Sequence, residues 1–246
     1  MPRPFLSVTL GVLLLAGGAH AESFTAEQRH EIVEVVRAAL KADPSILRDA
    51  AAALERDDAL RQDAAARAAI ASASDALKAR SGDPEAGNPA GDVTVIEFYD
   101  PRCPYCRRML PVVDALIKAD PGVRIVFKDM PILGPASVLE SKAMLAAQNQ
   151  NGYLRMQDAL MHDTPSATPD TVRDAARKAG LDADRLLRDM DDPRIQARID
   201  ANLSLARSLG VSGTPAFVVG QKLVPGAVEL GDLKQLVAEA RRHSGG

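Results

Sequence analysis

The first zone of the chain carries apolar residues at the spacing of a helix, which predicts a helical N-terminal arm over residues 22–80. Thr25 and Gln28 have the spacing of a capping box, which indicates where the first helix begins. Asp43 and Pro44 predict the start of a second helix, because aspartate is a favoured N-cap and proline fits the first helical position. That second helix is expected to continue almost to the end of the arm.

The apolar stripe of this arm is narrow. Leu40, Leu47 and Leu54 repeat at heptad intervals, and Ile70 and Leu77 have the same spacing. A helix with so thin a stripe cannot bury it against itself and needs a partner. The alternatives are packing on its own domain, a solvated arm, or contact with a second subunit. Heptad-like spacing is typical of packing between subunits, so we expect a self-association stalk.

The pattern changes at residues 81–92, where glycine, proline and polar residues predict a linker. A β-branched and aromatic run over 93–100 then predicts a central strand, followed by a helix over 103–120 and a second strand over 123–130. A strand, a helix and a strand in this order imply a parallel pair with a right-handed crossover.

The remainder is predicted to be mainly helical from about 135 to about 209. Two short apolar runs, 214–220 and 221–227, then predict a hairpin, and a last helix covers about 230–242. We therefore expect an α/β domain over residues 93–246 that contains a helical insertion.

The N-terminus has the layout of a cleaved secretory signal over residues 1–21. Arg3 precedes an apolar run from Phe5 to Ala16, and the small-x-small site ends at Ala21, where we expect the cut. An uncleaved membrane anchor is the alternative, but the apolar run is shorter than the ~20 residues that span a bilayer. The mature protein is therefore expected to be exported.

The net charge and the number of cysteines limit the functions that the sequence allows. The formal net charge of −3 gives no indication of a nucleic-acid partner. The chain has two cysteines, Cys103 and Cys106. An exported protein stabilised by disulfides normally carries several of them along its length. A bridge between such near neighbours closes too small a loop to constrain the unfolded chain much, so a purely structural disulfide is disfavoured.

A C-x-x-C that follows a strand and opens a helix is typical of thioredoxin-type chemistry. Cys103 is expected to be an exposed nucleophile, because free backbone N–H groups at the helix start stabilise its thiolate. Cys106, one turn further on, is expected to be more buried and to resolve the mixed disulfide. Pro104 fits an early helical position, and Tyr105 adds no positive charge, which favours a less extreme oxidant. The nearby cations either compensate in part or form a solvated helix face: Arg102, Arg107 and Arg108.

The segment GVSGTPAF places Thr214 and Pro215 at the start of a late strand. With CPYC, this motif resembles the thioredoxin-fold family, specifically its DsbA-like branch with a helical domain inserted into the thioredoxin fold. The resemblance implies a cis-Pro215 packed against the cysteine pair and a Thr214 backbone that holds client peptide. It also implies that Pro104 and Tyr105 contact the client.

Glu97 lies in an otherwise apolar strand. A buried carboxylate is unfavourable unless it has a partner or a task. The DsbA-like resemblance implies that Glu97 relays a proton for Cys106; the alternative is a solvent-exposed edge position. Lys128, on the neighbouring strand, is a candidate partner for Glu97.

The segment DPSILRDAAAALE in the arm resembles the suppressor-of-copper-sensitivity C proteins. This resemblance implies a periplasmic homo-oligomer, with trimers among its relatives, that reshuffles or reduces disulfides in exported client proteins. It also implies a membrane redox partner, either a reductase of the DsbD or ScsB type or an oxidase of the DsbB type. No cofactor is implied beyond the redox-active Cys103–Cys106 disulfide.

Three other functions stay open from the sequence alone. A disulfide oxidase of DsbA type would use the same residues, although the arm, Thr214 and the lack of a histidine between the cysteines favour an isomerase or reductase. A chaperone would act through the arm. A copper or zinc module is disfavoured because a structural zinc site needs four ligands and the mature chain's histidines are distant in sequence from the cysteines; two chains sharing Cu(I) through Cys103 is the remaining metal alternative. Those histidines are His30, His162 and His243.

Overall fold

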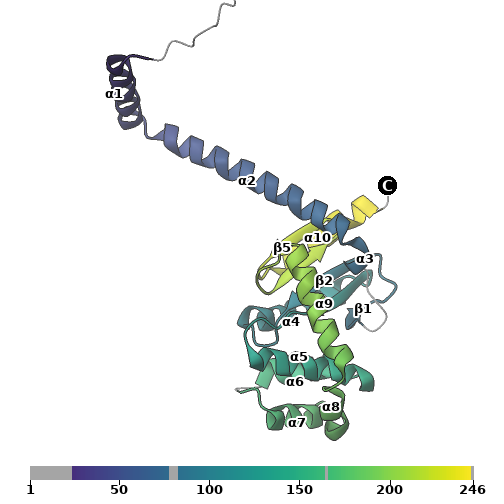
Figure 1. Ribbon diagram of the computed structural model, residues 1–246. Coiled ribbons are helices and arrows are strands. Elements are labelled where there is room, and N and C mark those ends of the chain that lie inside the picture. Colours follow the sequence, from purple (N-terminus) through teal and green to yellow (C-terminus); the bar gives the residue numbers. More distant parts are fainter. Residues whose placement is uncertain (1–23, 78–82, 164–165, 245–246) are drawn as a thin grey trace, which may run out of the picture. The chain divides into compact units, whose positions relative to one another are not determined.

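The computed structural model describes residues 24–77, 83–163 and 166–244 (Figure 1). The predicted signal segment with its cut after Ala21 lies outside the described residues. The chain divides into two compact units, and the division falls between Arg56 and Asp57.

The N-terminal unit is helical, as predicted. Helix α1 (Ala26–Ala42) begins with the expected capping box, in which the Thr25 hydroxyl accepts from the Gln28 N–H and the Gln28 side chain accepts from the Thr25 N–H. Helix α2 (Ser45–Ser72) begins after Asp43, whose carboxylate accepts a hydrogen bond from the Ser45 N–H at 3.0 Å. Large apolar side chains of this unit are exposed: Phe24, Ile32, Val33, Val35, Val36, Ile46, Leu47 and Leu54.

The C-terminal unit is built on a mixed sheet with the strand order β1-β3-β2-β4-β5. The predicted central strand β2 is parallel to β3, with helix α4 (Pro104–Ala119) between them in the chain. Strand β4 pairs antiparallel with β2, and β4 and β5 form the predicted hairpin. The strand bounds are β1 Glu85–Gly87, β2 Val93–Tyr99, β3 Val123–Asp129, β4 Ala216–Val219 and β5 Lys222–Pro225.

Strand β1 lies inside the predicted linker 81–92, so part of that segment is not a free connection. It pairs antiparallel with β3 at the edge of the sheet, and the Phe127 N–H donates to the Pro84 carbonyl at 2.9 Å. The sequence Glu-Ala-Gly contains none of the β-branched or aromatic residues that mark a strand, so pattern alone could not reveal it.

The helical stretch predicted between residues 135 and 209 is confirmed, and it is broken where glycine, proline and N-cap residues occur. A turn of 3-10 helix (Gln148–Gln150) separates the first two helices. The helices are α5 Pro135–Ala147, α6 Tyr153–Asp163, α7 Pro169–Lys178, α8 Ala183–Asp189 and α9 Pro193–Ser208, and α10 Leu230–Ser244 ends the described chain.

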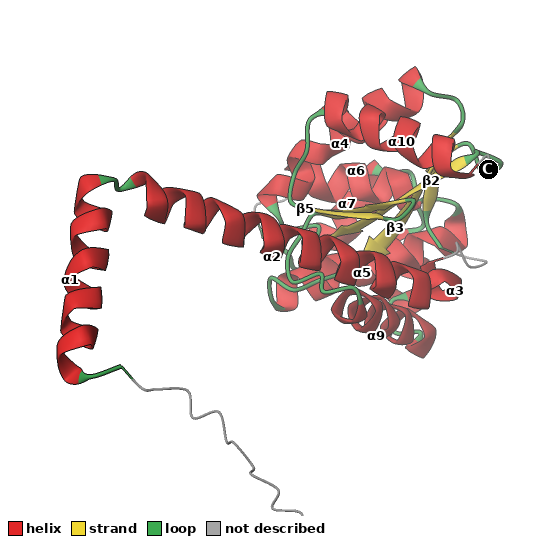
Figure 2. Ribbon diagram, turned by 90° about the horizontal axis from the view of Figure 1, so that it is seen from above, coloured by secondary structure: helices red, strands yellow, loops and turns green. Residues whose placement is uncertain are grey.

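Two apolar layers enclose the sheet, because successive strand residues point to opposite faces. Side chains of α4 and α10 cover one face, where Val95, Val113 and Val237 belong to one buried cluster. Helix α9, the last turn of α2 and the short α3 (Ser74–Leu77) cover the other (Figure 2).

The end of the predicted arm therefore belongs to this core. Ile70 and Leu77 are 6% exposed and pack with Phe98 and Val126 of the sheet. Their assignment to an intersubunit stripe is wrong, because helical periodicity shows that a face is buried but not what buries it. The heptad residue Leu54 stays exposed.

None of the helices within the described residues is both long enough and apolar enough to cross a membrane.

Candidate active site

The two cysteines lie where β2 runs into α4. Cys103 is the N-cap residue of α4 with extended backbone angles, φ −72° and ψ 121°. Its N–H donates to the carbonyl of Asp100 at 3.0 Å. Pro104 occupies the first helical position, where the backbone N–H has no partner within the helix, so the lack of an N–H in proline costs no hydrogen bond. Cys103 therefore lies at the end of α4 where the first-turn N–H groups have no partner within the helix, and such a helix N-terminus favours an anion.

Cys103 is less exposed than predicted. It is 5% exposed, and its thiol donates to the Thr214 carbonyl at 3.2 Å. The loop before β4, which is distant in sequence, covers the sulfur. The residues around Cys103 in the sequence could not predict this contact. The surface beside the pair is formed by Pro104 and Tyr105, both exposed, and the Arg108 guanidinium stacks on the Tyr105 ring at 4.5 Å.

Cys106 lies one turn inside α4 and is 1% exposed. Desolvation raises the pKa of its thiol far above the ordinary value, and the nearby charge of Glu97 raises it further. Both cysteines are free in this structure. In the dithiol form, Cys106 therefore holds its proton while Cys103 sits at the helix terminus that favours an anion.

The Thr214–Pro215 peptide bond is cis, as expected. Pro215 is buried and Thr214 is half-buried. The carbonyl that precedes this proline is the one that meets the Cys103 thiol, so the loop before β4 and the start of α4 meet at the reactive sulfur.

Glu97 is buried, which excludes the edge alternative. It is 4% exposed, and burial raises the pKa of its carboxyl to about 8. The predicted pairing with Lys128 is wrong. Glu97 lies opposite Phe127 in the register, so Lys128, the next residue, points to the other face of the sheet. The Lys128 ammonium instead pairs with the Asp83 carboxylate at 2.8 Å.

Asp100 is a site residue that sequence reasoning missed. Its buried carboxylate accepts from the backbone N–H groups of Arg102 at 2.7 Å, Ile132 at 2.7 Å and Leu133 at 3.0 Å. These bonds fix the turn that leads into Cys103 against the loop after β3. A charged residue directly at the end of a buried central strand was the available signal.

A second buried acid lies beside Glu97 on the same face of the sheet. Asp129 accepts hydrogen bonds from the Tyr153 hydroxyl at 3.0 Å and the Tyr99 hydroxyl at 3.3 Å. The two hydroxyls also contact each other. Desolvation raises the pKa of Asp129 to about 7. This cluster joins the sheet to helix α6 of the insertion, and the sequence carried no pattern that would pair these residues.

This geometry agrees with the comparison to known families. A family model described as a DSBA-like thioredoxin domain matches residues 94–238. The chain belongs to this family. The predicted thioredoxin fold with an inserted helical domain is thereby confirmed.

Solved structures of similar DsbA-like proteins extend the comparison. The thioredoxin-like oxidoreductase from Silicibacter pomeroyi DSS-3 is 45% identical, with a TM-score of 0.64, over 66% of this chain and 94% of that one. ScsC of Proteus mirabilis in a transitional conformation is 28% identical, with a TM-score of 0.65, over 89% of this chain and 100% of that one. The suppressor-of-copper-sensitivity C resemblance read from the sequence is confirmed by this similarity.

Curated relatives include a longer protein. Na(+)/H(+) antiporter NhaA 3 of Salinispora tropica is 31% identical over 150 residues, which are 60% of this chain. The chain spans 23% of the length of that relative.

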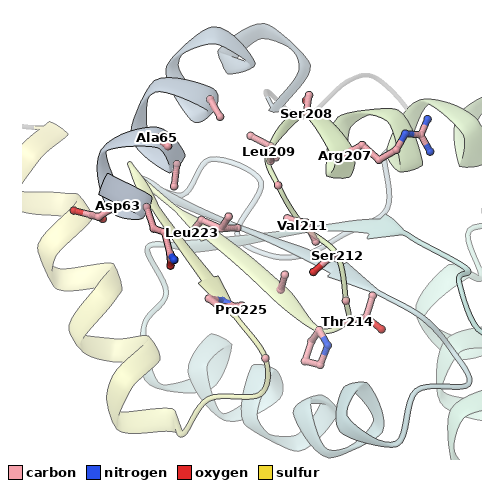
Figure 3. Close-up of a pocket in the computed structure, with 18 of the residues that line it drawn as sticks. Asp63, Ala65, Arg207, Ser208, Leu209, Val211, Ser212, Thr214, Leu223 and Pro225 are labelled. Carbon is pink, nitrogen blue, oxygen red and sulfur yellow. The ribbon is translucent and has the colours of Figure 1, made fainter. Parts of the chain in front are cut away.

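A groove of about 880 Å³ begins at the cis-proline loop of this DsbA-like unit (Figure 3). One wall is the alanine-rich part of α2 from Ala59 to Ala69, and the other runs from Arg207 at the end of α9 through the following loop to Ala216 at the start of β4. At its rim, Asp63 bonds to Lys222 at 3.1 Å and to Arg67 at 2.5 Å. The walls are mainly apolar, and Thr214 and Pro215 line one end.

Within the described residues, the contacts of His162 and His243 are made inside their own helices, away from the cysteine pair. His162 pairs with Asp158 of its own helix at 3.3 Å, and His243 contacts the Glu239 carbonyl at 2.7 Å. Within the described part of the chain, no group of three or more His, Cys, Asp or Glu side chains is arranged to hold a metal ion.

Proposed function

We propose that this protein is a thiol–disulfide oxidoreductase that acts on exported proteins in the periplasm. The observation that carries the proposal is the Cys103 thiol, held at the start of α4 against the carbonyl before cis-Pro215, with the buried Cys106 behind it. Family membership supports the same chemistry. The reaction needs no cofactor beyond the cysteine pair.

The proposed reduction of a client begins at Cys103. Its thiolate attacks one sulfur of a client disulfide, a mixed disulfide forms, and the other client sulfur leaves as a thiolate. Cys106 then loses its proton, with Glu97 as the acceptor, and attacks the Cys103 sulfur. The second client cysteine leaves as a thiolate and takes up the proton held by Glu97, so the client gains two electrons and the enzyme holds the Cys103–Cys106 disulfide. Oxidation of a client follows the same steps in reverse.

Isomerisation uses the first half of this sequence. A different client thiolate attacks the mixed disulfide, the client acquires a new disulfide, and Cys103 is released unchanged. We favour an isomerase or reductase over an oxidase. The lack of a histidine between the cysteines, Thr214 before the cis-proline and an arm with exposed apolar residues support this direction. A membrane reductase that keeps the pair reduced, and a homo-oligomer, belong to the same proposal.

Scrambled ribonuclease, in which the native disulfides are exchanged for wrong ones, provides the test. The mature protein with a catalytic amount of reduced thiol is expected to restore ribonuclease activity. Cys103→Ser should abolish this, because no mixed disulfide forms. Cys106→Ser should trap mixed disulfides that resolve slowly, which gel electrophoresis under non-reducing conditions detects.

The opposite result identifies an oxidase. If the protein oxidises reduced ribonuclease rapidly and leaves the scrambled form inactive, the isomerase proposal is wrong and the thiol–disulfide chemistry stands. If the double Cys→Ser variant acts as well as the wild type, the whole proposal fails and a chaperone role replaces it.

A further inference from the structure

A buried ion pair connects the active-site turn to the helical insertion. Glu140 of α5 is 0% exposed, and its Oε1 atom lies 3.2 Å from Nη1 of Arg102. Arg102 directly precedes Cys103, and its side chain is 23% exposed. The insertion therefore places a negative charge next to the residue before the nucleophile.

Packing does not account for a glutamate at this position. The second carboxylate oxygen of Glu140 is buried without a hydrogen-bond partner among the residues that the structure describes. The hydroxyls of Ser137 and Ser141, on the same face of α5, are likewise buried and unpartnered within the described chain. A half-satisfied buried charge is unfavourable compared with an apolar side chain of similar size.

The groups that act on Glu140 all surround the start of α4. Burial raises the pKa of Glu140, while Arg102 and, from inside α4, Arg107 lower it, and the carboxylate of Asp100 raises it. Arg107 also donates to the Pro101 carbonyl at 3.4 Å. Two guanidinium groups thus flank Cys103 in the chain, and Glu140 compensates their charge.

We propose that Glu140 is a positioning residue that sets the redox balance of the Cys103–Cys106 pair by holding the Arg102 charge away from the Cys103 thiolate. This inference rests on the proposed thiol–disulfide function. A cation near the thiolate stabilises the reduced form and makes the disulfide more oxidising. By occupying Arg102, Glu140 weakens that effect and keeps the pair in the range of an isomerase or reductase.

The test is the equilibrium of the mature protein with glutathione. One protein dithiol and one oxidised glutathione give one protein disulfide and two reduced glutathione molecules, so the equilibrium constant reports the stability of the disulfide. Glu140→Gln keeps the size of the side chain and removes its charge. It is expected to lower the constant by about three- to tenfold, because one unit charge acts over several ångströms in a partly buried site.

Arg102→Gln gives the opposite prediction. Removing the cation disfavours the thiolate, so the constant is expected to rise by a similar factor of about three to ten. The double variant, without either charge, should fall between the two single variants. A structural role for Glu140 destabilises both redox forms alike and leaves the constant unchanged, so this readout separates the two roles. Glu140→Ala serves where the glutamine variant does not fold.

Glu85→Gln is the matched control. Glu85 pairs with Arg124 at 2.5 Å in a partly exposed glutamate–arginine ion pair at the edge of the sheet. Arg124 lies at the start of β3, whereas Cys103 follows the end of the parallel strand β2. This variant is expected to keep the wild-type constant.

The outcomes separate this inference from the proposed function. If the wild type forms no reversible disulfide with glutathione, the proposed function fails. If the wild type equilibrates but Glu140→Gln leaves the constant within twofold of it, or raises it, the inference is wrong and the function stands.

Discussion

Glu97 and Cys106 form the part of the site in which burial controls the chemistry. Desolvation raises the pKa values of both groups and so favours their uncharged forms. Cys106 has to lose its proton before it can resolve a mixed disulfide. An acid whose pKa is about 8 exchanges a proton near neutral pH. Near neutral pH, Glu97 is mostly protonated, and its ionised fraction is the form that accepts the proton of Cys106 in the relay that we propose.

The same burial predicts a pH dependence of stability. The pKa of Glu97 is about 8 in the folded protein and about 4.5 in the unfolded chain. Between these values the folded protein holds a proton that the unfolded chain has released, so the free energy of unfolding falls as pH rises. Asp129, with a pKa of about 7 against 3.8, adds to the fall in the same direction. Glu97→Gln should reduce the fall by ~2–5 kcal/mol.

Urea denaturation of the reduced protein at several pH values from about 5 to about 9 measures this slope. Glu229→Gln, which changes an exposed carboxylate, should keep the wild-type slope. A Glu97→Gln variant whose stability falls as steeply as that of the wild type would show that Glu97 does not titrate in this range.

At the scale of elements, α2 combines two kinds of surface in one helix. Ile70 is 6% exposed and packs under the sheet, while Leu60 on the same helix is 70% exposed. Ile70→Ala should lower the free energy of unfolding by ~2–4 kcal/mol, because it opens a cavity in the core. Leu60→Ala should change it by less than ~0.5 kcal/mol.

Chemical denaturation of the mature chain at low protein concentration distinguishes the two variants. Equal and small effects would mean that the last turns of α2 do not belong to the folded core. Equal and large effects would mean that Leu60 is buried by another subunit under the conditions used.

The elements that could be predicted from the sequence are those with a strong local pattern. The strands β2 and β3 and helix α4 follow from apolar runs and from Pro104, and the capping box at Thr25 marks α1 correctly. Strand β1 was missed because its pairing with β3, and not its composition, makes it a strand. Local sequence patterns therefore fail to predict an element that depends on contacts between distant segments.

The same limit applies to the candidate site. The cysteine pair, Glu97 and the cis-proline were found because each leaves a local signal. The cover over Cys103, the partner of Lys128 and the pair of Glu140 with Arg102 are made by residues far apart in the sequence. A single sequence contains no information about such pairs unless a known fold supplies it.

At the scale of the whole molecule, the arm predicts self-association. Eight large apolar side chains between Phe24 and Leu54 are 44–69% exposed, and exposed apolar clusters of this kind mark interaction surfaces. Light scattering is expected to give an oligomer for the mature chain and a monomer for a chain that begins at Asp57. If both chains gave the same number of subunits per particle, the N-terminal unit would not be responsible for oligomerisation.

The place of the cut matters in this experiment. A chain that begins after residue 80 also loses Ile70 and Leu77, which belong to the core. Its altered behaviour would mix loss of association with loss of stability. A cut between Arg56 and Asp57 removes the eight exposed apolar residues between Phe24 and Leu54 and keeps the buried Ile70 and Leu77.

Strand β1 has a related consequence for a fragment that contains only the residues matched by the family model. The family match begins at residue 94, which leaves out β1, α3 and even the first residue of β2. Such a fragment would expose the edge of β3 and the part of the apolar sheet face that Ile70 and Leu77 cover. An exposed edge strand next to an apolar surface promotes strand pairing between molecules, and therefore aggregation. The residues that identify the family are therefore fewer than the residues that a soluble fragment of this protein needs.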